Sequence, residues 1–446
     1  MSSTGFGFAN PQPSPDDYNT FDPQDIAADS GVPIPPPATE VIPAPWKTPP
    51  VMSLDQVLGA SLVQQIQSSG QIVFHSVGDT GGVKEPSHQF AVADAMCNDL
   101  AGKTPATGLP AFFYHLGDVV YFFGQERYYY DQFYDPYRSY AGPIFAIPGN
   151  HDSVIYPAEP VKYSLEAFVE NFCSQQTGKD PAAKGYARTT MTQPGVYFTL
   201  NAPFVKIIGL YSNAGETAGV ISGGNTGTAQ LSFLQQQLQE AASQRAQKGS
   251  SPFALIIAVH HPPFTLSSGH FPSPQMLAQI DAACQDASIW PDMVLSGHAH
   301  LYERYTRVMK ADGRQIPYVV SGNGGYFNLT KPRTGQGGSP PQPGVPGNDG
   351  KGNVLTLNAI NGTMYGFLRI TASAGSILCE SLGVNESTGQ TSSIDSFTLD
   401  LSKHVVSNGA GASAAAKPKA KPSAKVAAKT KTKKSAANKG NRKGGG

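Results

Sequence analysis

Side chains that can bind metal ions recur in five short motifs of this sequence. The motifs are, in chain order, GDTGG at Gly78–Gly82, GDVVY at Gly117–Tyr121, GNHD at Gly149–Asp152, HHPP at His260–Pro263 and GHAH at Gly297–His300. Their carboxylate, amide, imidazole and phenol groups are enough to hold two ions. A pair of cations ~3.5–4 Å apart, bridged by a carboxylate, is the usual arrangement for metal-assisted hydrolysis. The motifs therefore predict hydrolytic chemistry at a two-metal centre.

Each motif follows a run of apolar or β-branched residues that is typical of a buried strand. These runs, with the motif residues at their ends, read IVFHSVGD, AFFYHLGD, PIFAIPGNHD, ALIIAVHHPP and DMVLSGHAH. The metal-binding side chains should therefore gather where strands end, which is where open α/β sheets place their sites.

Helices are expected between these strands, and further strands after them. Apolar residues at three- and four-residue spacing predict helices over Ser87–Gly102, Lys162–Cys173, Ala229–Gln244 and Pro274–Ala287. Later segments read as strands over Tyr302–Met309, Ile316–Ser321, Met364–Ala372, Ile377–Leu382 and Ile394–Leu401. No period of 20–50 residues recurs, which argues against a solenoid or propeller.

The first two motifs each place an aspartate directly after a glycine. Either Asp79 or Asp118 is suited to bridge two cations, while the other binds one of them. Tyr121 follows Asp118 by three residues and can point at the same place. A phenolate is a hard anionic ligand that favours Fe(III) over magnesium or zinc. The alternative is that Tyr121 simply packs, like the other tyrosines of this aromatic-rich stretch.

The histidine motifs leave one assignment open. His298 and His300 are two residues apart, so in an extended segment both rings lie on one face. His260 and His261 are neighbours and must point opposite ways on a strand, so one of them faces the site and spacing does not say which. Asn150 offers a neutral oxygen ligand.

The five motifs together resemble those of the calcineurin-like metallophosphoesterase superfamily. GDVVY and GHAHLYER are similar to the motifs of its purple acid phosphatase branch, and the resemblance covers roughly Ile72–Gly325, including SGNGG at Ser321–Gly325. It implies an α/β fold of the metallophosphoesterase type. That fold is a β-sandwich of two mixed sheets flanked by helices, in four αββα layers.

The resemblance also implies a role for each motif residue. The ligands of an Fe(III) ion would be Asp79, Asp118, Tyr121 and His300. A divalent ion (iron, zinc or manganese) would share Asp118 and also bind Asn150, His260 and His298. The catalytic residues would be His151 and His270, the latter ten residues beyond His260.

The implied activity is that of an acid phosphatase, which hydrolyses phosphate monoesters by attack of a metal-bound hydroxide. Two alternatives stay open. One is a metallophosphodiesterase or nucleotidase of the same superfamily, and the other is a polyanion-binding protein that acts through its basic tail.

Composition divides the chain into an acidic body and a basic tail. The last 43 residues contain 11 Lys and Arg and no acid, so residues 1–403 carry 21 basic and 32 acidic residues, a net charge of −11. We predict a Pro-rich extended arm over 1–50, a catalytic domain over 51–403 with a Gly/Pro-rich loop at 331–353, and a disordered Lys/Ala/Pro-rich tail over 404–446. The tail's charge suits contact with nucleic acid or another polyanion, and suits equally a solubilising role or contact with the acidic body.

Neither a signal peptide nor a membrane span is predicted. The first residues lack a basic stretch followed by an apolar one, and no run approaches about 18 apolar residues. A cytoplasmic protein is therefore expected, with export by another route as the alternative. The four cysteines are widely spaced, which favours buried thiols over a disulfide framework.

Overall fold

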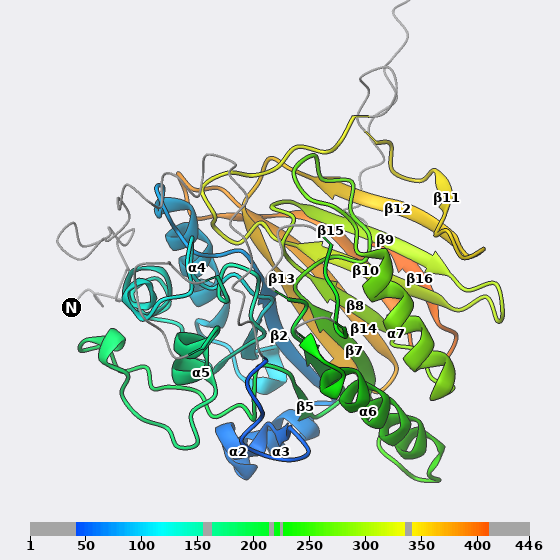
Figure 1. Ribbon diagram of the computed structural model, residues 1–446, viewed down its shortest axis with the longest axis horizontal. Helices are drawn as coiled ribbons and strands as arrows, with labels where there is room; N and C mark the ends of the chain where they lie inside the picture. Colours follow the sequence, from blue (N-terminus) through cyan, green and yellow to red (C-terminus); the bar gives the residue numbers. More distant parts are fainter. Residues whose placement is uncertain (1–41, 155–162, 214–217, 224–225, 335–340, 410–446) are drawn as a thin grey trace, which may run out of the picture. The chain divides into compact units, whose positions relative to one another are not determined.

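Two β-sheets packed face to face form the centre of the computed structural model, which describes residues 42–154, 163–213, 218–223, 226–334 and 341–409 (Figure 1). The larger sheet contains, in spatial order, β1 (Val51–Ser53), β5 (Phe198–Ala202), β6 (Val205–Leu210), β7 (Ala254–Val259), β8 (Met293–Ser296), β10 (Gln315–Ser321), β9 (Tyr302–Val308), β12 (Val354–Asn361) and β11 (Pro346–Asn348). The smaller sheet contains β16 (Val405–Asn408), β15 (Thr391–Asp400), β14 (Ser376–Val384), β13 (Gly366–Ser373), β2 (Gln71–Val77), β3 (Pro110–His115) and β4 (Ile144–Ala146).

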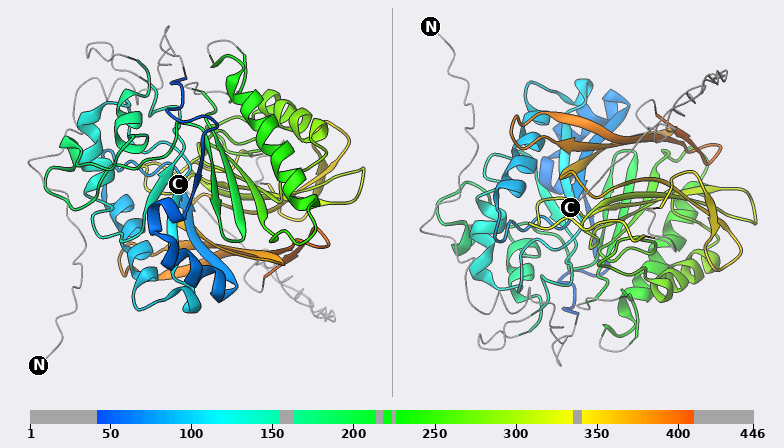
Figure 2. Two further views of the ribbon diagram at one scale, coloured as in Figure 1. Left: turned by 90° about the horizontal axis from the view of Figure 1, so that it is seen from below. Right: turned by 90° about the horizontal axis from the view of Figure 1, so that it is seen from above.

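Both sheets are mixed, and helices pack against part of the outer face of each. The helices are α2 (Asp55–Leu58), α3 (Ala60–Ser69), α4 (Ser87–Leu100), α5 (Glu166–Phe172), α6 (Ala229–Ala246) and α7 (Pro274–Asp286). Helices α6 and α7 lie on the outside of the larger sheet, and α4 packs against β13 and β14 of the smaller one (Figure 2). The predicted αββα architecture is confirmed, and the four predicted helices agree with α4, α5, α6 and α7 to within four residues at each end.

The strands that lead to the motifs are apolar on both faces because both faces are buried. On β3, Phe112 and Tyr114 lie in the core between the sheets, whereas Phe113 belongs to the outer core beneath the helices. Successive side chains of a strand point to opposite faces, so a strand with layers on both sides needs an uninterrupted apolar run. The continuous runs in the sequence thus reflect the four-layer packing.

Two short strands lie inside ranges that were expected to have no regular structure. Strand β16 lies inside the range predicted as tail, and it pairs antiparallel with β15, so the folded body continues to at least Asn408. Strand β11 lies inside the predicted Gly/Pro-rich loop and pairs with β12. Both are four residues or shorter, and such short edge strands form because a neighbouring strand offers its hydrogen-bonding groups, not because of local propensity.

The described part of the predicted arm lies along the body. Residues 42–50 contain neither helix nor strand, and Trp46 donates its indole N–H to the carbonyl of Gln193 over 2.9 Å. Residues 1–41 of the arm and 410–446 of the tail fall outside the described residues.

The remaining sequence expectations concern thiols, membranes and charge. All four cysteines are free thiols, and Cys173, Cys284 and Cys379 are buried.

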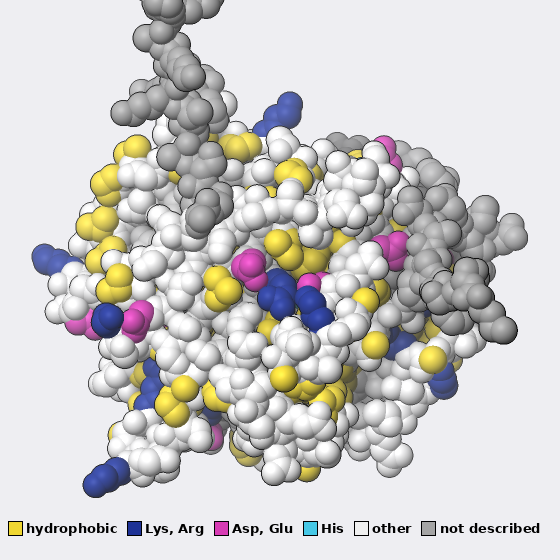
Figure 3. All heavy atoms as spheres, turned by 180° about the vertical axis from the view of Figure 1, so that it is seen from behind, with side chains coloured by type: hydrophobic (Ala, Val, Ile, Leu, Met, Phe, Trp, Pro, Cys, Tyr) yellow, Lys and Arg dark blue, Asp and Glu magenta, His cyan; other side chains and the backbone are white. Residues whose placement is uncertain are grey.

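No helix in the described ranges is long and apolar enough to span a membrane. On the face opposite to that of Figure 1, acidic and basic side chains of the body are interspersed (Figure 3).

Candidate metal centre

The five motifs meet at one edge of the sandwich, because each follows the carboxyl end of a strand. Asp79, Asp118 and Asn150 follow β2, β3 and β4, which run parallel in the smaller sheet. His260 and His298 follow β7 and β8, which are parallel neighbours in the larger sheet. The site is therefore shared between the two sheets and closes only when they pack together.

Unusual backbone conformations turn the ligand side chains into the site. Asp79, Asp118 and His298 have φ values of 56°, 54° and 65°, in the left-handed region that residues other than glycine rarely adopt. Strain of this kind persists at functional sites where the surrounding structure enforces it. Gly149 is needed for close approach, since a Cβ there would lie 2.0 Å from the Asp118 Oδ1 atom.

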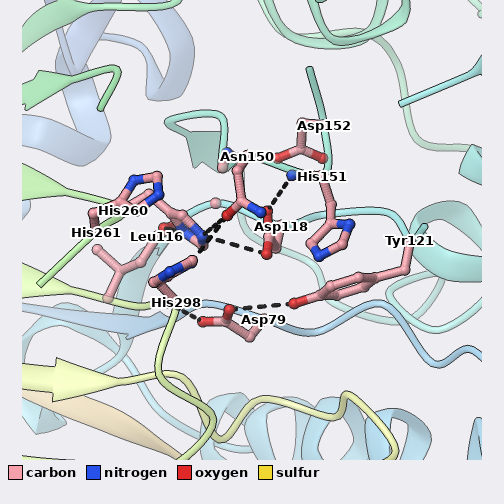
Figure 4. A network of polar contacts seen from close by, with 12 residues as sticks. Asp79, Leu116, Asp118, Tyr121, Asn150, His151, Asp152, His260, His261 and His298 are labelled. Carbon is pink, nitrogen blue, oxygen red and sulfur yellow. Dashed lines mark hydrogen bonds and ion pairs between the residues drawn. The ribbon is translucent and has the colours of Figure 1, made fainter. Parts of the chain in front are cut away.

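One group of donors joins Asp79, Tyr121 and His300. The Tyr121 hydroxyl donates to Asp79 Oδ1 over 3.2 Å (Figure 4). The same hydroxyl oxygen lies 3.3 Å from His300 Nε2. His300 Nε2 is also 3.5 Å from Asp79 Oδ1. Three side-chain atoms that could bind a metal ion, from three separate motifs, thus lie close together.

A second group joins Asp118, Asn150, His260 and His298. Asn150 Oδ1 lies 3.0 Å from His260 Nε2 and 3.0 Å from His298 Nδ1 (Figure 4). His260 Nε2 is 3.3 Å from Asp118 Oδ2. Ligand atoms of Asp118, His260 and His298 all lie within 4.8 Å of one another, a spacing at which they can share an ion.

The second group fits a bound cation. The carbonyl oxygen of Leu116 can only accept, so His260 Nδ1 donates to it over 2.8 Å and the lone pair of a neutral imidazole lies on Nε2. That lone pair faces the oxygens of Asn150 and Asp118. Asp118 Oδ2 and His298 Nε2 are buried without a hydrogen-bond partner. Oxygen and imidazole donors of this kind suit first-row divalent or trivalent ions.

Burial and mutual interaction shift the protonation of these groups. Burial raises the pKa of Asp79 above its usual value. Burial alone would also raise the pKa of Asp118, but the charges of His260 and His151 outweigh it and hold that pKa well below its usual range. Burial lowers the pKa of His260, yet the Asp118 carboxylate more than compensates and raises it to about 9. Without a metal ion, a proton on His260 therefore partly replaces the cation.

Two other ligand candidates are held neutral. Burial, followed by the neighbouring imidazoles of His261 and His270, lowers the pKa of His298 well below its usual value. Burial, followed by the charges of Asp118 and Asp79, raises the pKa of Tyr121 far above that of free tyrosine. A neutral imidazole is ready to bind a cation, whereas the phenol must lose its proton first.

The two predicted catalytic histidines lie beside the donor groups. The backbone N–H of His151 donates to Asp118 Oδ1 over 2.9 Å, and its Nδ1–H donates to the Phe122 carbonyl over 2.9 Å. The ring of His270 lies 4.6 Å from that of His298 and 4.8 Å from that of His300, between centroids. The structure brings both histidines to the site, while their catalytic roles stay predictions.

The choice between His260 and His261 is resolved by their partners. His261 Nδ1 lies 2.7 Å from the hydroxyl oxygen of Ser212, and the His261 backbone N–H donates to that same oxygen over 3.0 Å. Its ring packs 4.2 Å from the ring of His298. His260 therefore faces the donor atoms, and His261 supports His298 from the side.

Three supporting residues were missed from the sequence. The Asp152 carboxylate accepts the backbone N–H groups of Val119, Val120 and Gly149, so it joins two motif turns. Gln132 binds the Tyr121 backbone at both its N–H and its carbonyl. Tyr326 packs its ring 4.4 Å from that of Tyr121. Only Asp152, within GNHD, and Tyr326, directly after SGNGG, carried a sequence signal.

Comparison with known proteins identifies a family for this arrangement. Residues 73–302, just over half of the chain, match the family described as calcineurin-like phosphoesterase. No match was found among curated proteins.

The solved structures that match this chain have low sequence identity to it. They include GAP50, the anchor in the inner membrane complex of Plasmodium, which is 13% identical over 73% of this chain and 88% of that chain, with a TM-score of 0.46. Another is PhoD, 12% identical over 76% of this chain and 71% of that chain, with a TM-score of 0.45.

Proposed function

Since the chain belongs to the calcineurin-like phosphoesterase family, we propose that it is a purple acid phosphatase-like enzyme that hydrolyses phosphate monoesters. Family membership supports phosphoester hydrolysis at a metal centre. The finer assignment rests on one observation, the Tyr121 hydroxyl oxygen 3.2 Å from Asp79 Oδ1 and 3.3 Å from His300 Nε2.

Tyr121 favours a trivalent ion in the first donor group. Burial beside two carboxylates makes its ionisation unfavourable unless a strongly charged cation takes the place of the proton. Phenolate is a hard anionic ligand, which suits Fe(III) better than a divalent ion. A diesterase or nucleotidase of the same family would not require a tyrosine at this position.

The donors divide between two ions in the manner that the motif resemblance implies. Fe(III) would be held by Asp79, Asp118, Tyr121 and His300, and a divalent iron, zinc or manganese ion by Asp118, Asn150, His260 and His298. When bound, such a pair polarises the phosphoryl group and lowers the pKa of water toward neutrality.

The protein's own residues bind and orient the ester. His151 is anchored through its ring to the Phe122 carbonyl and through its backbone to Asp118, so its imidazole can hold a phosphoryl oxygen. His270, beside His298 and His300, would donate the proton that the leaving alcohol or phenol needs. Asp152 keeps the turns that carry Asp118 and Asn150 together.

Metal analysis with a visible spectrum tests the assignment. We expect two metal ions per chain, one of them iron, and an absorption band from charge transfer between tyrosinate and Fe(III). The Tyr121→Phe variant should keep its metals and lose the band. A colourless wild type that is loaded with iron would contradict the purple phosphatase assignment. Faster turnover of bis(p-nitrophenyl) phosphate than of p-nitrophenyl phosphate would favour a diesterase instead.

A further inference from the structure

His270 lies on a loop that has no helix or regular strand of its own. Residues 265–271 join β7 to α7, and within them only Ser267 takes part in a β-bridge. Loops of this type are more mobile than the elements they connect. A proton donor must nevertheless be held to within about 0.5 Å of its productive position. Within the loop, the Ser267 hydroxyl oxygen lies 3.4 Å from His270 Nδ1, and further contacts come from outside it.

A second segment, residues 330–333, runs beside this loop. Ser267 forms an antiparallel bridge with Pro332, and the Ser268 N–H donates to the Lys331 carbonyl over 2.9 Å. The Arg333 N–H donates to the Leu266 carbonyl over 2.5 Å. The beginning of the Gly/Pro-rich stretch is thus paired with the His270 loop along its backbone.

The side chain of Arg333 holds the same loop at two points. Its Nη2 atom donates to the carbonyl of Ser267 over 3.2 Å and to the carbonyl of His270 over 3.2 Å. Its guanidinium lies 5.3 Å from the centre of the exposed Phe271 ring. One nitrogen of the guanidinium therefore binds the carbonyls at both ends of the turn from Ser267 to His270.

The segment that carries Arg333 is itself attached to the metal centre. The Thr330 N–H donates to the carbonyl of His300 over 2.8 Å, and the Ser267 hydroxyl donates to that of Thr330 over 3.0 Å. A chain of short contacts thus runs from His300 through Thr330 and Arg333 to His270. This chain connects the backbone of His270 to the backbone of His300, a candidate ligand.

We propose that Arg333 is a positioning residue that fixes His270 at the metal centre by binding the carbonyls at both ends of the Ser267–His270 turn. The proposal rests on the proposed function, in which His270 donates a proton to the leaving group. The side-chain hydrogen bonds of Arg333 go to backbone carbonyls, so it acts through His270.

The proposal predicts a kinetic pattern that simple structural damage would not produce. Loss of a general acid costs about 10²–10⁴-fold, and a misplacement of 1 Å costs up to about 10²-fold. We expect Arg333→Ala to lower kcat about 10–100-fold on an alkyl phosphate, with KM changed less than about threefold. The loss should be smaller on p-nitrophenyl phosphate, whose leaving group needs less protonation.

A double-mutant cycle separates positioning from other effects. In a His270→Ala background, Arg333→Ala should change kcat less than about twofold, because its partner is already absent. Arg333→Lys, which keeps a charged nitrogen donor on a more flexible side chain, should fall between wild type and Arg333→Ala. Arg314→Ala, in the turn after β9, is the matched control and should leave kcat unchanged.

Hydrogen exchange supplies a measurement that does not depend on turnover. The amides of Ser268 and Gly269, which are hydrogen-bonded to Lys331 and to the Ser267 hydroxyl, should exchange faster in Arg333→Ala than in wild type. An alkyl phosphatase rate within twofold of wild type, or an additive loss in the cycle, would overturn the role of Arg333. If the wild-type protein hydrolyses neither ester, the proposed function is wrong. In that case hydrogen exchange still tests the positioning role, and unchanged exchange of the Ser268 and Gly269 amides in Arg333→Ala would overturn it.

Discussion

Two buried clusters of charged or polar side chains lie near the beginning of β9, and they differ in how completely their carboxylates are hydrogen-bonded, although Arg304 Nη1 of the first cluster also has no hydrogen-bond partner. In the inter-sheet cluster (Tyr302, Arg304 and Asp395), one Asp395 oxygen accepts from Arg304 Nε and the Tyr302 hydroxyl, and the other accepts from Arg304 Nη2. In the metal centre, by contrast, Asp118 Oδ2 and His298 Nε2 have no hydrogen-bond partner.

The difference separates structural from functional use of buried polarity. A buried carboxylate that is fully bonded to arginine holds two sheets together, because leaving either partner alone is costly. Buried carboxylate and imidazole atoms that face one another are costly to the fold, and only the proton on His260 offsets this until a cation binds. Asp395 therefore stabilises the architecture, whereas Asp118 and His298 belong to the candidate metal centre.

The largest expected effect is the loss of activity on changing a proposed metal ligand. His298→Asn should lower kcat on the order of 10³-fold and reduce the metal content. The metal-free chain should lose less than about 1 kcal/mol of unfolding free energy, since asparagine accepts a left-handed backbone better than histidine. Metal analysis, kinetics and urea unfolding of the metal-free variant check this. A large loss of stability would mean that His298 is structural.

The inter-sheet cluster should show the opposite behaviour. Arg304→Ala should lower the free energy of unfolding by about 3–5 kcal/mol, because the buried Asp395 carboxylate would lose its charged partner. The folded fraction should still bind two metals. Urea unfolding measures the change, and the double variant Arg304→Met, Asp395→Leu is the control, which should recover much of the stability. No recovery would argue that the pair does more than compensate charge.

Glu303, which lies between Tyr302 and Arg304 in the sequence, should make the free energy of unfolding depend on pH. It accepts the Leu266 N–H over 2.9 Å, and burial raises its pKa from 4.5 to about 7. The unfolded side chain ionises first, so the folded state loses stability as pH rises from about 4.5 to 7, by up to about 3 kcal/mol. Glu303→Gln keeps an acceptor that cannot ionise. It should be more stable than wild type near pH 8 and no more stable near pH 4, as measured by urea unfolding at both values.

The smallest effect is expected beside His261. Ser212→Ala removes the hydroxyl that binds His261 and should cost about 1 kcal/mol of stability. The metal content should not change, and kcat should stay within about threefold, because His261 only supports His298. Metal analysis and kinetics decide the point. Loss of one metal ion would show that His261 is closer to a ligand than its contacts indicate.

Much of the site was readable from the sequence because its signals are local. Each motif joins an apolar run to a glycine and a donor residue, so strand, turn and ligand are encoded within about ten residues. For the same reason, the helices and the strands that lead to the motifs were predicted to within a few residues. The edge strands β11 and β16 were missed because their pairing depends on neighbours far along the chain.

The sequence by itself determined which donor atoms are present and that they lie at strand ends, since both follow from side-chain type and from short-range periodicity. Only the tertiary structure decided that His260 and not His261 faces the donors, because that choice depends on contacts with Leu116 and Ser212 from other segments. The tertiary structure also decided that His270 lies beside the candidate metal centre. A loop has no periodicity to read, and its position here is set by hydrogen bonds to Arg333, more than sixty residues away.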